Sequence, residues 1–145
     1  MKKNSLKLAI ILLFLAGSVL CCKKDNEDLL SKTTWKLIGF VNVVYEEIKE
    51  VEPNSDICYI LTFNMDKTFS GYSSTNELRG NYDINYTTSY INFYQIGGTE
   101  INELFDGKLY IESLSKVDFF SLQENELKLY YNNKQNYLLY KSWKL

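Results

Sequence analysis

Residues 58–72 read CYILTFNMDKTFSGY, and this stretch decides the expected fold. The run 58–63 is apolar and rich in strand-forming residues, Met65-Asp66-Lys67 makes a tight turn, and the run 68–72 resumes the pattern. Two such runs on either side of a short polar turn predict an antiparallel hairpin. The whole chain, with 12 tyrosines, eight phenylalanines and one proline among 145 residues, has the composition of a β-rich domain.

Working outward, the same pattern predicts six further strands. The acidic segment 46–56 contains Pro53 and is expected to be a loop. The first strand is expected to extend as far as Tyr45. The six strands are predicted over residues 33–45, 78–84, 89–94, 117–122, 127–131 and 137–143.

One segment between the fifth and sixth predicted strands has a different period. Thr99 is a suitable helix cap, and Glu100 and Glu103 would lie in the first turn. Gly107 predicts a kink or an early end of this helix. The sequence therefore predicts a mainly β domain with one inserted helix, forming a small antiparallel β-barrel or curled sheet of about eight strands. The apolar residues at helical spacing are Ile101, Leu104, Phe105, Leu109, Ile111 and Leu114.

The first 22 residues have the pattern of an export signal. Lys2, Lys3 and Lys7 are basic, residues 8–20 are mostly apolar, and Cys21-Cys22 follow directly. A basic start, a short apolar region and small residues near the cleavage point are typical of signal peptides. The apolar run of about 13 residues is shorter than the ~20 that a membrane-spanning helix needs.

The cysteine pair resembles the lipobox of bacterial lipoproteins, in which the cysteine is lipidated and becomes the first residue of the mature chain. A lipobox has an aliphatic residue three positions before this cysteine and a small residue immediately before it. Cys22 has Val19 and Cys21 at these positions, whereas Cys21 has Ser18 and Leu20, which fit less well. Cys22 is the expected attachment site and Cys21 the alternative. The other interpretations are an uncleaved signal anchor and a plain secretory signal.

Lipidation at Cys22 divides the chain into a signal peptide (1–21), a polar tether (22–31) and a folded domain (32–145). The tether begins CKKDNED, which is similar to lipoproteins of the Bacteroidota, where acidic residues after the cysteine favour export to the outer face. The resemblance implies an outer-membrane anchor in the cell envelope, with surface exposure. A diacyl pair with an additional acyl chain such as palmitate would hold firmly, because a single chain binds membranes only marginally.

Charge and composition narrow the partners and the chemistry. The signal removes three of 16 basic residues and none of the 18 acidic residues, so 13 against 18 leave a mature net charge of −5. Nucleic acid and anionic lipid surfaces both favour basic partners, and we expect neither to be the main partner. The chain has no histidine, which removes the commonest general base and metal ligand and any Ser-His-Asp triad.

Other candidate chemistry is sparse. The acidic residues of segment 46–56 lack the spacing of a calcium loop. Any catalysis would have to use carboxylates alone, such as Asp118 with Glu124 or Glu126. We therefore expect a protein that is not an enzyme and that has no cofactor and no metal. Cys58 is expected to be a buried structural thiol, without a disulfide partner if Cys22 is acylated.

Several short motifs resemble the META/HslJ-like domain family. The pattern of that family has a Trp-x-Leu start, a strand and turn leading to glycine, a Cys-Asn pair and a Gly-x-Tyr motif. The resemblance covers roughly residues 33–141 and implies a structural role for most of the matching positions. These positions are Trp35, Gly71, Asn76, Gly80 and Tyr82.

The chain departs from this pattern at the cysteine before the asparagine, which is Thr75 here. The partner cysteine that the family has shortly after the position of Thr99 is also missing. The absence of both cysteines of the implied disulfide is consistent, because a single unpaired thiol would be open to oxidation. The resemblance implies a likeness to heat-induced envelope proteins and no enzymatic mechanism, and no redox role is carried over.

Two binding functions are consistent with these observations. The first is an accessory or stress-related lipoprotein that binds another envelope protein through one face of the domain. The alternative is a lipocalin-like carrier of a small apolar ligand, since lipocalin-like lipoproteins also open with Trp and carry Gly-x-Tyr; their helix usually follows the barrel strands.

Two groups of side chains have a functional and a structural interpretation. The tyrosines of segments 82–94 and 130–140 would either form an outward stacking platform for sugars or peptides or surround the core with their hydroxyls in solvent. Asn76 would be either a polar site residue or, as we expect, a residue whose side chain bonds the backbone of its own turn.

The lipidation site is testable with two matched variants. We expect Cys22→Ser to abolish acylation and release the protein from the membrane fraction, because the sulfur that carries the diacyl group is lost. Cys21→Ser is the control and should remain membrane-bound. Fractionation with and without globomycin measures the effect; a Cys22→Ser protein that stays in the membrane would exclude this anchor.

Overall fold

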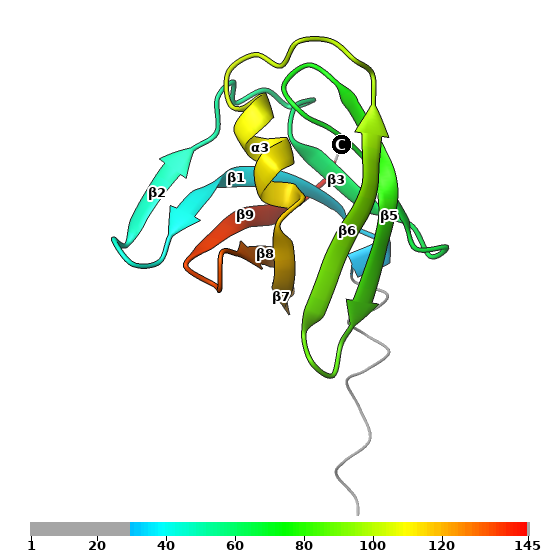
Figure 1. Ribbon diagram of the computed structural model, residues 1–145, viewed down its shortest axis with the longest axis vertical. Helices are drawn as coiled ribbons and strands as arrows, with labels where there is room; N and C mark the ends of the chain where they lie inside the picture. The colour runs from blue at the N-terminus through cyan, green and yellow to red at the C-terminus, as the bar shows by residue number, and fades with distance from the viewer. Residues whose placement is uncertain (1–29, 145) are drawn as a thin grey trace, which may run out of the picture.

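The computed structural model describes residues 30–144, which fold into one antiparallel sheet with helix α3 between its sixth and seventh strands (Figure 1). No helix within these residues is long and apolar enough to cross a membrane. The elements are β1 (Thr34–Asn42), β2 (Glu47–Glu50), β3 (Ile60–Phe63), β4 (Thr68–Tyr72), β5 (Glu77–Asn85), β6 (Tyr90–Gly98), α3 (Gly107–Leu114), β7 (Val117–Gln123), β8 (Glu126–Tyr131) and β9 (Asn136–Trp143).

The sheet closes on itself through its first and last strands. From β3 to β9 each strand pairs with the next, and β1 pairs with both β3 and β9. β9 pairs along the whole of β1, so β2 and β3 share the other edge of β1. Eight strands therefore form a closed ring, and β2 prolongs one end of it as a hairpin with β1 (Figure 1).

The prediction of a mainly β fold with one inserted helix is confirmed, and all eight predicted strands belong to the ring. The acidic segment 46–56, predicted as a loop, contains the additional strand β2. All four residues of β2 are exposed, so no alternation of apolar and polar residues marks it in the sequence. β1 ends at Asn42 rather than Tyr45, because Asn42 Oδ1 accepts hydrogen bonds from the backbone N–H groups of Val44 and Tyr45 at 3.0 and 3.1 Å.

The predicted helix start at Thr99 is wrong, because α3 begins eight residues later, at Gly107. The Thr99 hydroxyl donates to Asn76 Oδ1 at 2.8 Å and accepts from the backbone N–H of Glu77 at 3.1 Å. These bonds hold the backbone at Thr99 against the start of β5. Side-chain contacts with a distant turn thus override the local helical pattern of Ile101, Leu104 and Phe105.

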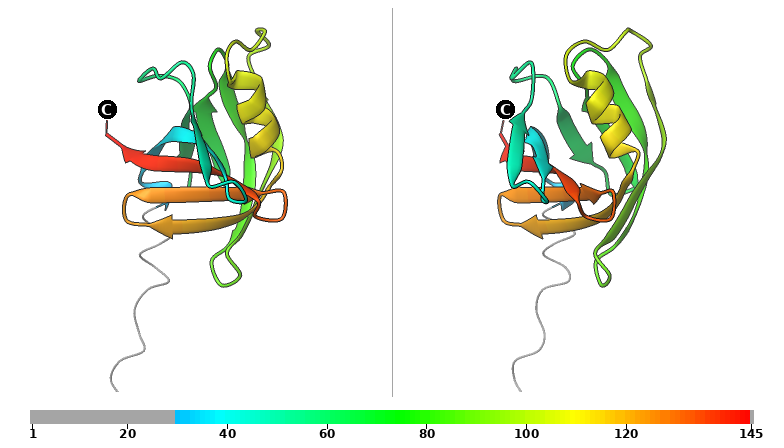
Figure 2. Two further views of the ribbon diagram at one scale, coloured as in Figure 1. Left: turned by 90° about the vertical axis from the view of Figure 1, so that its left-hand side faces the viewer. Right: turned by 60° about the vertical axis from the view of Figure 1, so that its left-hand side comes forward.

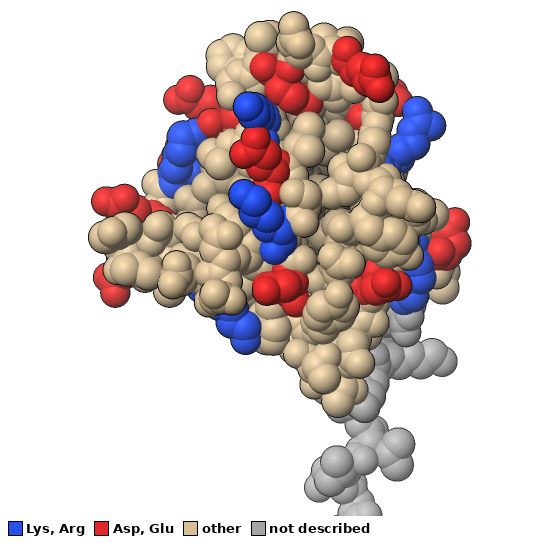
Figure 3. Space-filling model, in the orientation of Figure 1, with Lys and Arg blue, Asp and Glu red and all other residues tan. Residues whose placement is uncertain are grey.

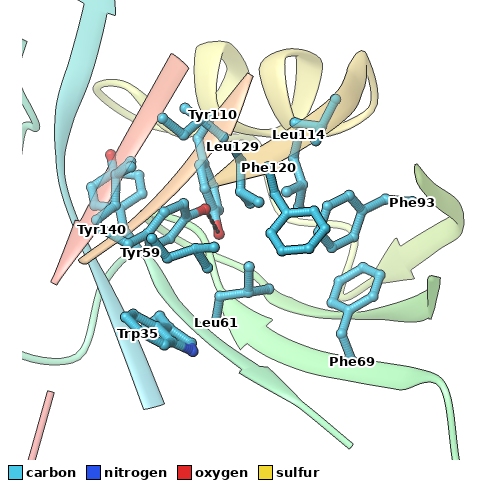
Figure 4. Close-up of a cluster of buried hydrophobic side chains, with 14 of the residues drawn as sticks. Trp35, Tyr59, Leu61, Phe69, Phe93, Tyr110, Leu114, Phe120, Leu129 and Tyr140 are labelled. Atoms are coloured by element: carbon cyan, nitrogen blue, oxygen red, sulfur yellow. Dashed lines mark hydrogen bonds between the residues drawn. The ribbon is translucent and has the colours of Figure 1, made fainter. Parts of the chain in front are cut away.

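Aromatic and aliphatic side chains fill the interior of the ring (Figure 4). The hydroxyls of Tyr110 and Tyr140 lie 3.1 Å apart, and burial raises the pKa of both well above its ordinary value. Tyr59 packs edge-on against Tyr110 with ring centroids 5.4 Å apart. The largest fully buried side chains are Trp35, Tyr59, Tyr110, Tyr140, Phe63, Phe69, Leu30, Leu37, Leu61, Ile91, Leu114 and Leu127.

Helix α3 completes the ring where strand pairing is weakest. β6 pairs with β7 at one position only, Tyr90 with Phe119. The remainder of β6 runs beside α3 (Figure 2). α3 turns Tyr110 and Leu114 into the core, where both are fully buried. The helix is therefore positioned by burial of its apolar face against the sheet.

Two glycines offer a matched test of the close packing between β3 and β4. A Cβ on Gly71 would lie 2.1 Å from the backbone oxygen of Ile60, whereas a Cβ on Gly97 would meet nothing within 4 Å. We expect Gly71→Ala to lower the free energy of unfolding by about 1–3 kcal/mol, as other overpacked sites do. Gly97→Ala should stay within about 0.5 kcal/mol of the unsubstituted protein. Urea unfolding measures both, and equal stability of the two variants would contradict this packing.

Candidate functional site

Three loop segments meet at one end of the ring, which we call the loop end: residues 52–58, 73–76 and 99–106 (Figures 1 and 2). The Cys58 thiol lies 3.5 Å from the backbone oxygen of Ser74. The Ser74 Oγ lies 2.6 Å from the backbone oxygen of Leu104. The backbone N–H of Asp106 donates to the oxygen of Glu52 at 3.1 Å. The three segments therefore form one connected unit.

A single carboxylate organises the loop end. Glu103 accepts hydrogen bonds from the hydroxyls of Ser73 and Ser74 at 2.6 and 2.7 Å and from Asn76 Nδ2 at 2.6 Å, and Thr75 Oγ1 lies 3.3 Å away. Burial alone would raise the pKa of Glu103, but these donors outweigh it and hold the pKa below its usual range. Glu103 is thus ionised at neutral pH and already saturated with donors. Its role is to bind residues 99–106 to the turn at 73–76.

Asn76 makes further hydrogen bonds that join residues 99–106 to the turn at 73–76. Its Nδ2 donates to the backbone oxygen of Ile101 at 2.7 Å, and its Oδ1 accepts from the backbone N–H of Ile101 at 2.8 Å. Thr99 also donates to this Oδ1. The expectation that Asn76 bonds the backbone of its own turn is therefore wrong, because the side chain spans to the segment 23–27 residues away. The residue is 4% exposed, and its polar atoms are used within the fold.

The start of α3 is shaped by the same cluster. A Cβ on Gly107 would lie 1.9 Å from Glu103 Oε2 and 2.2 Å from Ser74 Oγ, so only glycine lets the cluster approach the helix so closely. The preceding Asp106 accepts from the backbone N–H of Glu52 at 2.9 Å and forms an ion pair with Lys49. Gly107, at which a kink or an early end of the helix was predicted, is thus the first residue of the helix.

Apolar side chains project from the loop end into solvent, and we call these four the apolar rim: Ile57, Ile101, Leu104 and Phe105. Their exposed fractions are 70, 58, 56 and 70%. The top of Figure 3 is correspondingly uncharged, with acidic residues on either side. Single exposed apolar residues are common, but apolar groups gathered on connected loops are typical of interaction surfaces. The arrangement offers a contact surface.

The remaining motif residues have structural positions. Trp35 is fully buried, and its indole N–H donates to the backbone oxygen of Leu30 at 3.3 Å. Tyr82 is 2% exposed, and its hydroxyl donates to the backbone oxygen of Asn64 at 2.9 Å. Gly80 lies at a register shift between β5 and β6, where a Cβ would be 2.7 Å from a buried phenylalanine ring. Like Gly71, these residues build the core and the strand contacts.

Two predicted features concern cysteines. Cys22 and its alternative Cys21 lie outside the described residues. Cys58 is 8% exposed, as expected of a buried thiol, and it forms no disulfide within residues 30–144. Among residues 30–144, no three or more Cys, Asp or Glu side chains gather in a way that would hold a metal ion.

Some of the tyrosines predicted as a platform point into the ring of strands, and others are exposed to solvent. Tyr82, Tyr131 and Tyr140 are buried, whereas Tyr90 and Tyr94 are 43 and 39% exposed. The alternation of inward and outward side chains along each strand separates them. A continuous tyrosine platform over both segments is therefore not formed.

Sequence reasoning missed Lys36. It lies between two inward-facing residues of β1, yet it is only 3% exposed, because loop 52–58 covers it. Its amine donates to the backbone oxygens of Ser55, at 2.5 Å, and Cys58. Desolvation lowers the pKa of Lys36 from its ordinary value. A lysine in an alternating strand resembles any solvated lysine in sequence, so only the loop contact distinguishes it.

The polar cluster predicts a specific stability effect. We expect Glu103→Gln to lower the free energy of unfolding at pH 7 by about 1–3 kcal/mol, because hydrogen bonds to a charged acceptor are lost. The folded pKa of Glu103 is lowered, so its contribution is present above the unfolded pKa and disappears as pH falls through the folded pKa. The difference between the two proteins should therefore shrink in acid.

Urea unfolding at pH 7 and at pH 3 measures this effect. Glu100→Gln is the matched control, since Glu100 is exposed in the same segment. It should leave stability nearly unchanged at both values of pH. Equal loss in both variants would show that Glu103 has no special part in the cluster.

Comparison with known proteins places this fold and its family. No protein-family model matches the chain. Two solved structures share the fold, each at 19% sequence identity. The first is a DUF4847 family protein from Bacteroides vulgatus, with a TM-score of 0.61 over 79% of this chain and 95% of that one. The second is a protein from Burkholderia xenovorans, with a TM-score of 0.66 over 88% of this chain and 94% of that one.

A relative from Tannerella forsythia shows the family. It is named "Putative lipoprotein" and is 30% identical over 143 residues, which cover 97% of this chain and 96% of the relative. Identity at this level over nearly the full length of both proteins shows common descent. The chain therefore belongs to the same family as this Tannerella protein.

Proposed function

We propose that the protein is a non-catalytic lipoprotein of the cell envelope that binds another envelope protein through the apolar rim. The observation that carries this proposal is the exposure of Ile57, Ile101, Leu104 and Phe105 on loops held in place by the Glu103 cluster. A rim on a pre-ordered frame binds without first having to order its loops, which lowers the cost of association. Membership in a lipoprotein family supports the envelope location.

The position of the rim agrees with attachment through the N-terminus. The described chain begins at Leu30 in the lower half of the view in Figure 1, whereas the segment 99–106 forms its top. A lipid on Cys22 would therefore leave the loop end directed away from the tether. We propose an outer-membrane anchor with the rim facing a partner outside the lipid surface.

The carboxylates support a binding role over catalysis. Glu103 is saturated by four side chains of the turn. Glu126 is engaged by Lys141 at 2.5 Å and by Lys128 at 3.0 Å, and these partners hold its pKa below the usual range. A general acid needs a raised pKa and access to substrate, and neither residue has both.

The filled interior favours surface binding over the carrier alternative. The rings of Tyr59, Tyr110 and Tyr140 occupy the centre of the ring of strands, where a carried ligand would have to lie (Figure 4). A lumen that holds a ligand in a small barrel needs space among its inward side chains. The surface of the loop end is thus the better candidate.

The resemblance to META/HslJ-like domains is retained as part of this proposal. Thr75, which replaces the cysteine of that pattern, accepts from the backbone N–H of Leu104 at 3.2 Å. The hydrogen-bonded cluster joins the two segments that the disulfide of the pattern would join. We propose that this noncovalent link serves the same structural purpose, in an accessory role during envelope stress.

Cross-linking on intact cells tests the partner surface. We expect the double variant Leu104→Ser/Phe105→Ser to lose a cross-linked protein partner while keeping its unfolding midpoint, because both side chains are mostly exposed. Val43→Ser/Val44→Ser is the matched control, since these valines are 46 and 63% exposed on the β1–β2 hairpin. If only the control variant lost the partner, the interface would lie on the hairpin, and the apolar rim would be excluded as the binding surface.

A further inference from the structure

A second surface feature lies on the outer face of the sheet, and none of the residues that line it belongs to the apolar rim. A shallow groove of about 410 Å³ runs over β3, β4 and β5 and the start of β1. Pockets that hold small ligands have volumes of about 300–1,000 Å³. The side chains that line this groove belong to two neighbouring outward rows of the sheet, which follow from the strand register.

The first row is polar and crosses four strands. Thr34 pairs with Thr62, Thr62 with Ser70, and Ser70 with Arg79. The hydroxyls of Thr34 and Thr62 lie 3.5 Å apart. Each hydroxyl both donates and accepts, and the guanidinium adds up to five donors. The row therefore offers a line of hydrogen-bonding groups on a rigid frame.

Arg79 is the charged group of this row. It is the only arginine of the chain, and it is exposed. Within residues 30–144 it forms no ion pair and no hydrogen bond through its side chain. Its neighbour on β6 is Gly97, beside which there is open space. The guanidinium thus lies exposed at one end of the groove, with no partner in the part of the chain that the structure describes.

The second row supplies an apolar surface and an acceptor. Ile60 pairs with Tyr72, and Tyr72 with Glu77. The Tyr72 ring is 46% exposed, and its hydroxyl lies 3.4 Å from Glu77 Oε1. Ile60 and the backbone of Gly71 also line the groove. An aromatic face therefore lies beside a row of hydroxyls, with a carboxylate and a guanidinium at the same end.

Trp143 extends the first row on the other side. It pairs with Thr34, and its indole N–H is buried and has no hydrogen-bond partner among residues 30–144. The row from Trp143 to Arg79 spans five strands, which at ~4.8 Å between neighbouring strands is a length of ~19 Å. The groove itself is lined from Thr34 to Arg79, and a row of hydroxyls that ends in an exposed guanidinium suits an extended ligand rather than a small ion.

We propose that this outer groove binds an oligosaccharide. The opposite charges of Glu77 and Arg79 cancel, which disfavours a simple anion. The mixture of donors and acceptors matches the hydroxyl groups of a sugar chain, and the Tyr72 face suits the apolar side of a sugar ring. A hydrocarbon ligand would leave the hydroxyls and charges of the groove unpaired, at a cost in free energy.

Titration of the full-length lipoprotein tests the proposal, with the protein solubilised in a zwitterionic detergent that has no sugar headgroup. The probes are cellotetraose, maltotetraose, chitotetraose and tetragalacturonate. Calorimetry measures affinity, and tryptophan fluorescence reports on the groove, because Trp35 is fully buried in the core and Trp143 is not. We expect at least one tetrasaccharide to bind and to change the fluorescence.

The variants separate this groove from other surfaces. We expect Arg79→Ala and Tyr72→Ala each to weaken binding at least tenfold, while the urea midpoint is unchanged. Tyr90→Ala is the control, since Tyr90 is 43% exposed, close to the 46% of Tyr72, but lies outside the groove. The proposal is overturned if none of the four probes binds at millimolar concentration, or if both groove variants bind as well as the control.

Discussion

The pairing of β1 with β9 is the interaction on which the rest of the structure depends. Eight residue pairs join the first strand of the sheet to the last, along the whole of β1. A closed sheet has an inside, so side chains at alternate positions of distant strands meet there. Trp35 from β1 and Tyr140 from β9 are fully buried as a result. Without this closure, the aromatic residues of the chain would have no common core to fill.

Closure also explains why the surface features lie where they do. The ring is filled inside, so binding surfaces are left to the loops and to the outward rows of the sheet. At the loop end, Glu103 and Asn76 position a segment that has no regular backbone pairing of its own. Buried polar groups that satisfy one another in this way rigidify a loop as strand pairing rigidifies a sheet. On the outer face, the strand register alone aligns the hydroxyl row of the groove.

The sequence predicted the strands of the ring well, because their apolar positions alternate with a period of two. It failed at β2 and at the start of α3, for different reasons. β2 has no buried face, so nothing in its composition distinguishes it from a loop. The segment before α3 has a helical pattern at Ile101 and Leu104, but the bonds of Asn76 and Thr99 hold its backbone elsewhere. Tertiary hydrogen bonds won over local propensity there.

The site residues divide in the same way. Trp35, Gly71, Gly80 and Tyr82 were predicted to be structural from short motifs. Trp35 and Tyr82 are buried, and a Cβ on Gly71 or Gly80 would meet a neighbouring strand or ring. Glu103 was predicted to lie in the first turn of the helix, but the helix begins at Gly107. The four partners of Glu103 come from a turn 27–30 residues earlier in the chain. Lys36 and Arg79 look alike in sequence, as basic residues in alternating strands. Only the fold buries the first under a loop and leaves the second exposed on the outer face of the sheet.

By itself, the sequence determined the fold class and the composition of the core, since both depend on the chemistry of adjacent or periodic residues, and it predicts an export signal with its cysteine pair. Only the tertiary structure decided how the sheet closes, which turn holds residues 99–106 and which outward side chains share a row. These features depend on register and on contacts between residues far apart in the chain, and local patterns carry no information about either.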